Sequence, residues 1–134
     1  MKALVVDDDL MTRMILEDVL STYAEVHTCA DGDEAVPAFR SALECGAPFD
    51  LICMDVLMTR MGGLEALTLI RREEELHADT GQQNSKVIMT TASDDREIID
   101  QAFRGLCDAY VIKPIDAAEL IDIVHCLFPL ETRA

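Results

Sequence analysis

The stretch Asp50-Leu51-Ile52-Cys53-Met54-Asp55 places four apolar residues between two acids. Similar short runs recur along the chain, each ends in an acid, a hydroxyl residue or a Lys-Pro pair, and longer segments of helical character separate them. The five runs are Ala3 to Val6, Glu25 to Cys29, Leu51 to Met54, Val87 to Thr90 and Ala109 to Ile112. Several are apolar at successive positions, as strands covered on both faces should be. The alternation predicts the α/β class, with a (βα)₅ doubly wound sheet of five parallel strands.

Two helical segments can be placed more closely. The last one carries one apolar stripe and has Asp116 in position to cap its start. The stripe consists of Leu120, Ile121, Val124, Leu127 and Phe128. An earlier helix is expected over Asp31 to Glu44, where acids in the first turn favour a helix start and Pro37 lies near that start or kinks the helix. The polar stretch from His77 to Ser85 is expected to form a surface loop.

Bulk properties limit the function. The 134 residues fit one domain, here 1–134, with no room for an output domain. A formal charge of -15 repels nucleic acid and anionic membranes, so neither is expected as a partner. No apolar stretch approaches the length of a membrane-spanning helix, which favours a cytoplasmic location. The five cysteines form no C-x-x-C pair and are expected to be reduced and mostly buried.

Polar residues follow four of the predicted strands. Asp7-Asp8-Asp9 follows the first strand and Asp55 the third, while the fourth leads into Thr91-Ala92 and the fifth into Lys113-Pro114. Ligands of open parallel sheets bind outside the carboxyl ends of the strands, so these residues define the candidate site. Each alone has an ordinary explanation as a turn, cap or sheet residue. Their joint placement at one edge favours a functional site.

The chemistry of this edge points to a divalent cation and a phosphoryl group. Carboxylates gathered at one edge repel one another unless a cation neutralises them. Mg²⁺ prefers oxygen ligands and commonly joins protein carboxylates to a phosphate. Asp55 can then act as a nucleophile that forms an aspartyl phosphate. The Lys113 ammonium, the Thr91 hydroxyl and backbone amides after Asp55 supply partners for the phosphoryl oxygens.

These motifs resemble the receiver domains of bacterial response regulators, and the resemblance spans nearly the whole chain. The segments that carry it are Leu-Val-Val-Asp7-Asp8-Asp9, Asp50-Leu-Ile-Cys-Met-Asp55-Val-Leu-Met-Thr-Arg-Met-Gly-Gly63, Val-Ile-Met-Thr-Thr91-Ala92 and Ala-Tyr110-Val-Ile-Lys113-Pro114. The resemblance implies a CheY-like, flavodoxin-like sheet with strand order 2-1-3-4-5. It also implies a stand-alone receiver of a two-component system, which catalyses only its own phosphorylation and dephosphorylation.

The resemblance further assigns roles. Asp55 would be phosphorylated by a sensor histidine kinase or a histidine phosphotransfer protein. The ion would be Mg²⁺, with Mn²⁺ as an alternative, held by Asp8, Asp55 and the Leu57 carbonyl, with Asp7 acting through water. Thr91 and Tyr110 would form a coupled switch. The switch would act on an unknown downstream protein through the fourth helix, fifth strand and fifth helix, roughly residues 94–127.

The surface loop around Ala78 to Asn84 is longer than in compact members of the family, and two features of the loop after Asp55 also depart from the family pattern. Thr59 stands where a proline is usual, and Gly62-Gly63 replaces the common Asp-Gly pair, so the loop after Asp55 is expected to be more mobile than in other members. None of these departures removes a chemical group from the site.

Two other functions remain open from the sequence. A small haloacid dehalogenase-type phosphatase would use Asp7 as its nucleophile in an Asp7-x-Asp9 motif, but only one helix follows Lys113, and such enzymes need a further acidic motif there. A degenerate receiver would bind partners without phosphorylation, but it would lack one of the acids or the lysine, and all are present here.

Overall fold

The computed structural model describes residues 1–58, 60–78, 83–92 and 96–129, in which five strands alternate with five helices. Thr59, the centre of the expected polar loop at 79–82 and the start of the expected readout segment at Asp94 lie outside these ranges. The elements are β1 (Lys2–Val6), α1 (Leu10–Leu20), β2 (Glu25–Cys29), α2 (Gly32–Glu44), β3 (Leu51–Asp55), α3 (Gly63–Leu76), β4 (Lys86–Thr91), α4 (Arg96–Arg104), β5 (Ala109–Ile112) and α5 (Ala117–Leu127).

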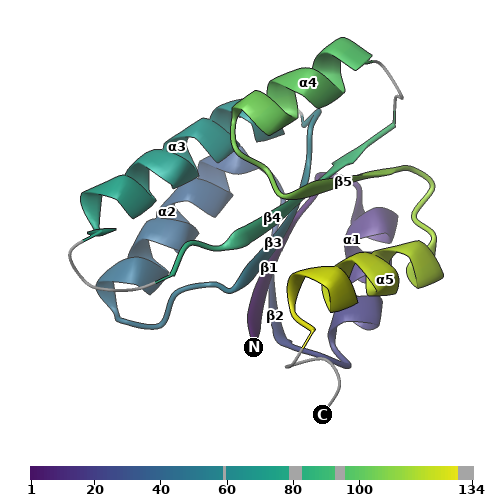
Figure 1. Cartoon of the computed structure of the whole chain (residues 1–134), viewed down its shortest axis with the longest axis horizontal. Coiled ribbons are helices and arrows are strands. Elements are labelled where there is room, and N and C mark those ends of the chain that lie inside the picture. The colour runs from purple at the N-terminus through teal and green to yellow at the C-terminus, as the bar shows by residue number, and fades with distance from the viewer. Residues whose placement is uncertain (59, 79–82, 93–95, 130–134) are drawn as a thin grey trace.

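The strands form one parallel sheet in the order β2-β1-β3-β4-β5. Helices α2, α3 and α4 cover one face of the sheet, and α1 and α5 cover the other (Figure 1). The predicted α/β class and strand order are therefore confirmed. Three strands extend one residue beyond their apolar runs at one or both ends, because the backbone pairing of Lys2, Lys86 and Asp55 needs no apolar side chain.

The core has two halves, one on each side of the sheet. In β3, Ile52 and Met54 point into the half beneath α2 and α3, whereas Leu51 and Cys53 point into the half beneath α1 and α5. Successive side chains of a strand point to opposite faces, so a strand buried on both sides must be apolar at every position. This explains the uninterrupted apolar run that precedes Asp55.

Helix caps were placed correctly where the sequence offered a capping acid. The Asp31 carboxylate accepts a hydrogen bond from the Glu34 amide at 3.0 Å and caps α2, and Asp116 caps α5 in the same way. Pro37 lies inside α2, in the sixth position of a helix that continues to Glu44. No helix in the described ranges is both long and apolar enough to cross a membrane.

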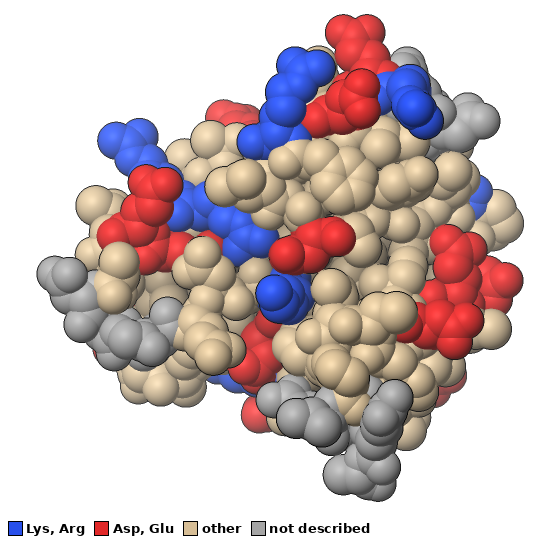
Figure 2. All heavy atoms as spheres, viewed as in Figure 1, with Lys and Arg blue, Asp and Glu red and all other residues tan. Residues whose placement is uncertain are grey.

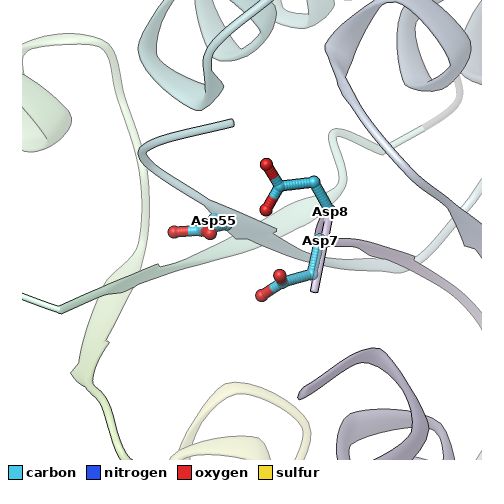
Figure 3. Close-up of side chains that lie close together, drawn as sticks. All are labelled: Asp7, Asp8 and Asp55. Carbon is cyan, nitrogen blue, oxygen red and sulfur yellow. The ribbon is translucent and has the colours of Figure 1, made fainter. Parts of the chain in front are cut away.

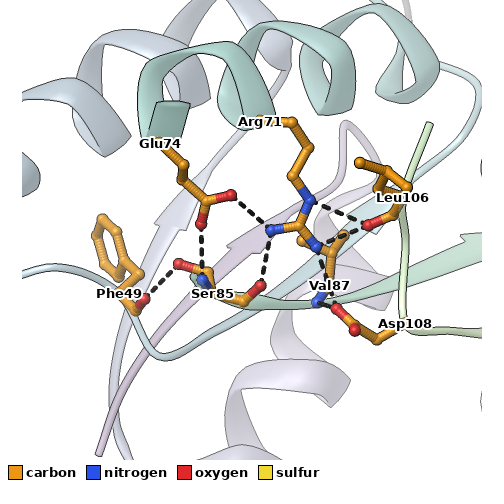
Figure 4. A network of polar contacts seen from close by, with 7 residues as sticks. All are labelled: Phe49, Arg71, Glu74, Ser85, Val87, Leu106 and Asp108. Atoms are coloured by element: carbon orange, nitrogen blue, oxygen red, sulfur yellow. Dashed lines mark hydrogen bonds and ion pairs between the residues drawn. The ribbon is translucent and has the colours of Figure 1, made fainter. Parts of the chain in front are cut away.

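A half-buried arginine joins three segments at the amino-terminal ends of β4 and β5 (Figure 4). The Arg71 guanidinium from α3 donates to the Glu74 carboxylate at 2.7 Å, to the Ser85 carbonyl at 2.8 Å and to the Asp108 carboxylate at 3.1 Å. Two further bonds reach the Leu106 carbonyl. All five N–H groups of the guanidinium therefore have acceptors. The network therefore lies at the amino-terminal ends of the strands, whereas the acidic residues lie at the carboxyl ends.

Candidate functional site

The strand ends gather three acidic side chains at one edge of the sheet. Asp7 and Asp8 follow β1 and Asp55 ends β3, and Figure 3 shows their carboxylates close to one another. One oxygen from each lies within 4.8 Å of the others. The parallel pairing of β1 with β3 produces this arrangement, since Val6 lies opposite Met54 and the next residues on both strands are the aspartates.

Lys113 reaches the acids from the loop after β5. Its Nζ lies 3.0 Å from Asp55 Oδ2, as a hydrogen bond, and 3.0 Å from Asp7 Oδ2, as an ion pair without hydrogen-bond geometry. Asp7 is fully buried and Asp55 is 6% exposed, whereas Asp8 is exposed. One ammonium thus pairs with two of the three clustered carboxylates, and Lys113 alone does not balance their negative charge.

Burial and the contact between Asp55 and Lys113 both affect the pKa values of these two groups. Burial raises the pKa of Asp55 above its ordinary value, and the hydrogen bond from Lys113 offsets this only in part. Burial acts to lower the pKa of Lys113, but its close contacts with the Asp7 and Asp55 carboxylates raise it overall. The lysine therefore remains a cation, while the charged form of Asp55 lacks full compensation.

The donor set fits a hard divalent cation. Three carboxylate oxygens converge, and Asp7 Oδ2 is buried without a hydrogen bond. Mg²⁺ takes such oxygen ligands and keeps several waters. Its charge would offset the excess negative charge that Lys113 leaves. The carboxylates of Asp7, Asp8 and Asp55 are therefore close enough together to hold such an ion.

Backbone amides and Arg13 hold the acids in position. The Asp9 amide donates to Asp7 Oδ1 at 2.8 Å, and the Leu57 amide donates to Asp55 Oδ1 at 3.3 Å. Arg13 from α1 donates to the Asp7 carbonyl at 2.8 Å, a contact that the sequence analysis did not anticipate. The Asp9 side chain accepts from Thr12 and caps α1. It is thus not part of the acidic cluster.

The two proposed switch residues lie on neighbouring strands. Thr91 is buried at the end of β4, and its carbonyl accepts a hydrogen bond from the Lys113 amide at 2.7 Å. Tyr110 is half-buried on β5, where its ring meets the edge of Phe103 from α4 at 5.8 Å between centroids. No sequence pattern had singled out Phe103. Because Phe103 lies in α4 and Tyr110 in β5, their rings form an aromatic contact between two elements of the expected readout surface.

The loop after Asp55 is tied to α2. Arg60 Nε lies 3.1 Å from Asp33 Oδ2 and 3.6 Å from Asp31 Oδ2, and the Gly32 amide donates to the Met61 carbonyl at 3.1 Å. The acids at the start of α2 therefore anchor this loop as well as capping the helix. The opposite charges of Arg60 and Asp33 were visible in the sequence, but their contact depends on the packing of α2 beside α3.

Comparisons with known proteins agree with this geometry. Residues 3–125 match the family model described as response regulator receiver domain. The chain is 32% identical over 124 residues to the response regulator protein VraR of Staphylococcus epidermidis, covering 92% of this chain and 54% of VraR. It is 31% identical over 135 residues to probable histidine kinase 2 of Oryza sativa subsp. indica, covering 93% of this chain and 12% of the kinase. The chain thus spans about half or less of the length of these relatives.

A solved structure is similar as well. The receiver domain of the histidine kinase CKI1 from Arabidopsis thaliana, complexed with Mg²⁺ and BeF₃⁻, superposes with a TM-score of 0.79 at 27% identity, covering 94% of this chain and 88% of that one. Fold, site and sequence therefore agree, and this chain belongs to the response regulator receiver domain family of two-component systems. The phosphatase alternative finds no support, and Asp9 of its motif caps a helix instead.

Proposed function

We propose that Asp55 accepts a phosphoryl group from a phosphohistidine. The observation that carries this proposal is the contact of the Asp55 carboxylate with the Lys113 ammonium at 3.0 Å, beside two further acids. An Asp55 oxygen would attack phosphorus, the phosphorus–nitrogen bond to the donor imidazole would break, and an acyl phosphate would form on Asp55. The donor histidine would keep the bonding electron pair and take up a proton.

The groups around Asp55 would stabilise the transferred phosphoryl. Lys113 would pair with one of its oxygens, and the Thr91 hydroxyl would donate to another. A bound Mg²⁺, or Mn²⁺ in its place, would neutralise charge shared by the carboxylates and the phosphoryl oxygens. We assign its ligands as Asp8, Asp55 and the Leu57 carbonyl, with Asp7 acting through water. The related CKI1 domain is described with Mg²⁺ and BeF₃⁻, which supports Mg²⁺ as the ion.

Thr91 and Tyr110 would then transmit phosphorylation to α4, β5 and α5. The phosphoryl group can bias this switch only by the difference in its contacts with the two states. We infer that the donor is a histidine kinase or a phosphotransfer protein and that the target is another protein. Three further points stay predictions. They are a single stand-alone domain that catalyses only its own phosphorylation and dephosphorylation, a cytoplasmic location, and the absence of nucleic-acid and membrane partners.

Labelling with acetyl phosphate and Mg²⁺ tests the proposal. Wild-type protein should take up one phosphoryl group, and peptide mapping should place it on Asp55. Asp55→Asn should abolish labelling, while Asp9→Asn, a matched loss of one nearby carboxylate outside the cluster, should retain it. Lys113→Ala should keep some labelling but lose the conformational response. Full labelling of the Asp55→Asn protein would place the acceptor elsewhere.

A further inference from the structure

A groove of about 500 Å³ runs along α5 beside the edge strand β5. Four acids line it: Asp108 before β5, the α5 cap Asp116, and Glu119 and Asp122 within α5. No Lys or Arg is among its described lining residues. Figure 2 shows acidic side chains gathered where α5 begins in Figure 1. The groove therefore presents a surface of one charge sign.

Two of these acids are available for a partner. Asp108 pairs with Arg71, and Asp116 is occupied as the cap of α5. Glu119 and Asp122 are exposed, and neither makes an ion pair with any residue in the described ranges. They lie three positions apart in one helix, so their side chains are neighbours on its surface. Opposite charges brought by another molecule would therefore meet two unpaired carboxylates.

The groove also has an apolar part. Ile123 and Leu127 line it one helical turn apart, and both are half-buried. Each packs against the core beneath α5 on one side and keeps accessible surface on the other. A ligand can bury this remaining surface, which favours binding, while its charges meet the acids. The pattern is that of an apolar anchor site bordered by negative charge.

We propose that this groove binds a cationic amphipathic segment of the protein that the receiver controls. An apolar side chain of that segment would rest on Ile123 and Leu127, and its Lys or Arg residues would pair with Glu119 and Asp122. A second copy of this chain is a poor occupant, because each copy carries a formal charge of -15 and would bring acids against acids. Nucleic acid is disfavoured for the same reason.

The groove is connected to the proposed phosphorylation site. The regulation of the groove, as inferred here, rests on the proposed phosphorylation of Asp55. β5 carries the groove residue Ala109 next to the switch residue Tyr110. The loop between β5 and α5 carries both Lys113, which contacts the acids, and Asp116, which lines the groove. A shift of this strand or loop on phosphorylation would change the groove. Binding of the cationic segment should therefore differ between the free and the phosphorylated receiver.

A synthetic 14-residue amphipathic peptide of Leu and Lys, fluorescently labelled, can serve as the probe, with a peptide of Leu and Glu as its charge-reversed control. Fluorescence anisotropy at 0.15 M salt would give the dissociation constants. The Glu119→Lys/Asp122→Lys protein should bind the Lys peptide about tenfold more weakly than wild type, from the loss of two charge pairs. Glu44→Lys/Glu65→Lys removes two exposed acids of α2 and α3 and changes the net charge equally, so its affinity should stay within about twofold.

If both double variants lose affinity for the Lys peptide equally, the attraction comes from net charge alone and the proposal is overturned. If neither variant loses affinity, the proposal is overturned as well. Glu119→Gln/Asp122→Asn keeps side-chain size and should also lose affinity, so a folding defect of the Lys variant cannot decide the outcome. Labelling of Asp55 by acetyl phosphate should be unchanged in every variant. Because that readout is separate, failure of the groove and failure of the phosphoacceptor site can be told apart.

Discussion

Gly63 packs directly against the backbone of Asp55. A Cβ atom at Gly63 would stand 2.1 Å from the Asp55 carbonyl oxygen, and the Gly63 amide donates to the Val56 carbonyl at 2.8 Å. The start of α3 is thus seated on the strand end that carries the proposed phosphoacceptor. Glycine is required here for space, since its φ is not positive.

Gly63→Ala should therefore destabilise the protein and disturb the site. The added methyl group meets backbone rather than a flexible side chain, so the cost should resemble that of overpacking, about 1–3 kcal/mol. Urea unfolding would measure it. Gly62→Ala is a matched control, because its Cβ would meet only the Val56 carbonyl, at 3.3 Å. A Gly63→Ala protein as stable as the control would show that the helix start adjusts freely.

Millimolar Mg²⁺ should raise the melting temperature. An ion that binds only the native state stabilises it by RT ln(1 + [L]/Kd), about 2.7 kcal/mol at 100 times Kd. Differential scanning fluorimetry with and without Mg²⁺ would detect a shift of several degrees for a domain of this size. Asp8→Asn removes an exposed proposed ligand and should reduce the shift. Identical melting curves for the wild type would argue against the metal site.

Arg71→Ala should be among the most destabilising substitutions away from the site. It leaves Glu74, whose side chain is 4% exposed, without its counter-charge, and breaking such a buried pair costs about 3–5 kcal/mol. Arg72→Ala, on the exposed side of the same helix, should change stability by about 0.5 kcal/mol or less. Both values can be read from urea unfolding. Adding Glu74→Gln to Arg71→Ala should recover part of the loss, and an unchanged double variant would contradict this explanation.

Buried thiols should make the protein labile to alkali. Burial raises the pKa of Cys29 and Cys107 to about 11 and that of Cys53 to about 12, from an ordinary thiol pKa of 9.0. Between these values the unfolded chain loses thiol protons that the native state keeps, so stability is present below pH 9 and falls as pH rises toward 11. The urea midpoint measured from pH 8 to pH 11 would follow this decline. Cys29→Ser/Cys107→Ser should flatten the curve, and an equally steep decline would assign the effect to other groups.

The fold was predictable because its signal is local. A strand buried on both faces must be apolar at successive positions, and β3 shows this in Leu51 to Met54 before Asp55 interrupts it. Capping acids such as Asp31 and Asp116 are equally local, since they bond to amides two or three residues ahead. The exact ends of the strands were less predictable. Backbone hydrogen bonding between strands continues past the apolar run wherever the neighbouring strand is in register.

The sequence by itself determined that a site with acids and a lysine lies at the carboxyl ends of a parallel sheet. The residue types that follow four of the strands were enough for this. The family resemblance had assigned Asp7 and Asp8 to the metal. Tertiary structure decided how Asp7 joins the cluster while Asp9 caps a helix, because the turn after β1 points the two side chains in different directions. It also decided the contact of Arg71 with Asp108 and of Gly63 with Asp55. Those contacts depend on how helices pack on the sheet, and no local pattern records the distance between segments that are far apart in sequence.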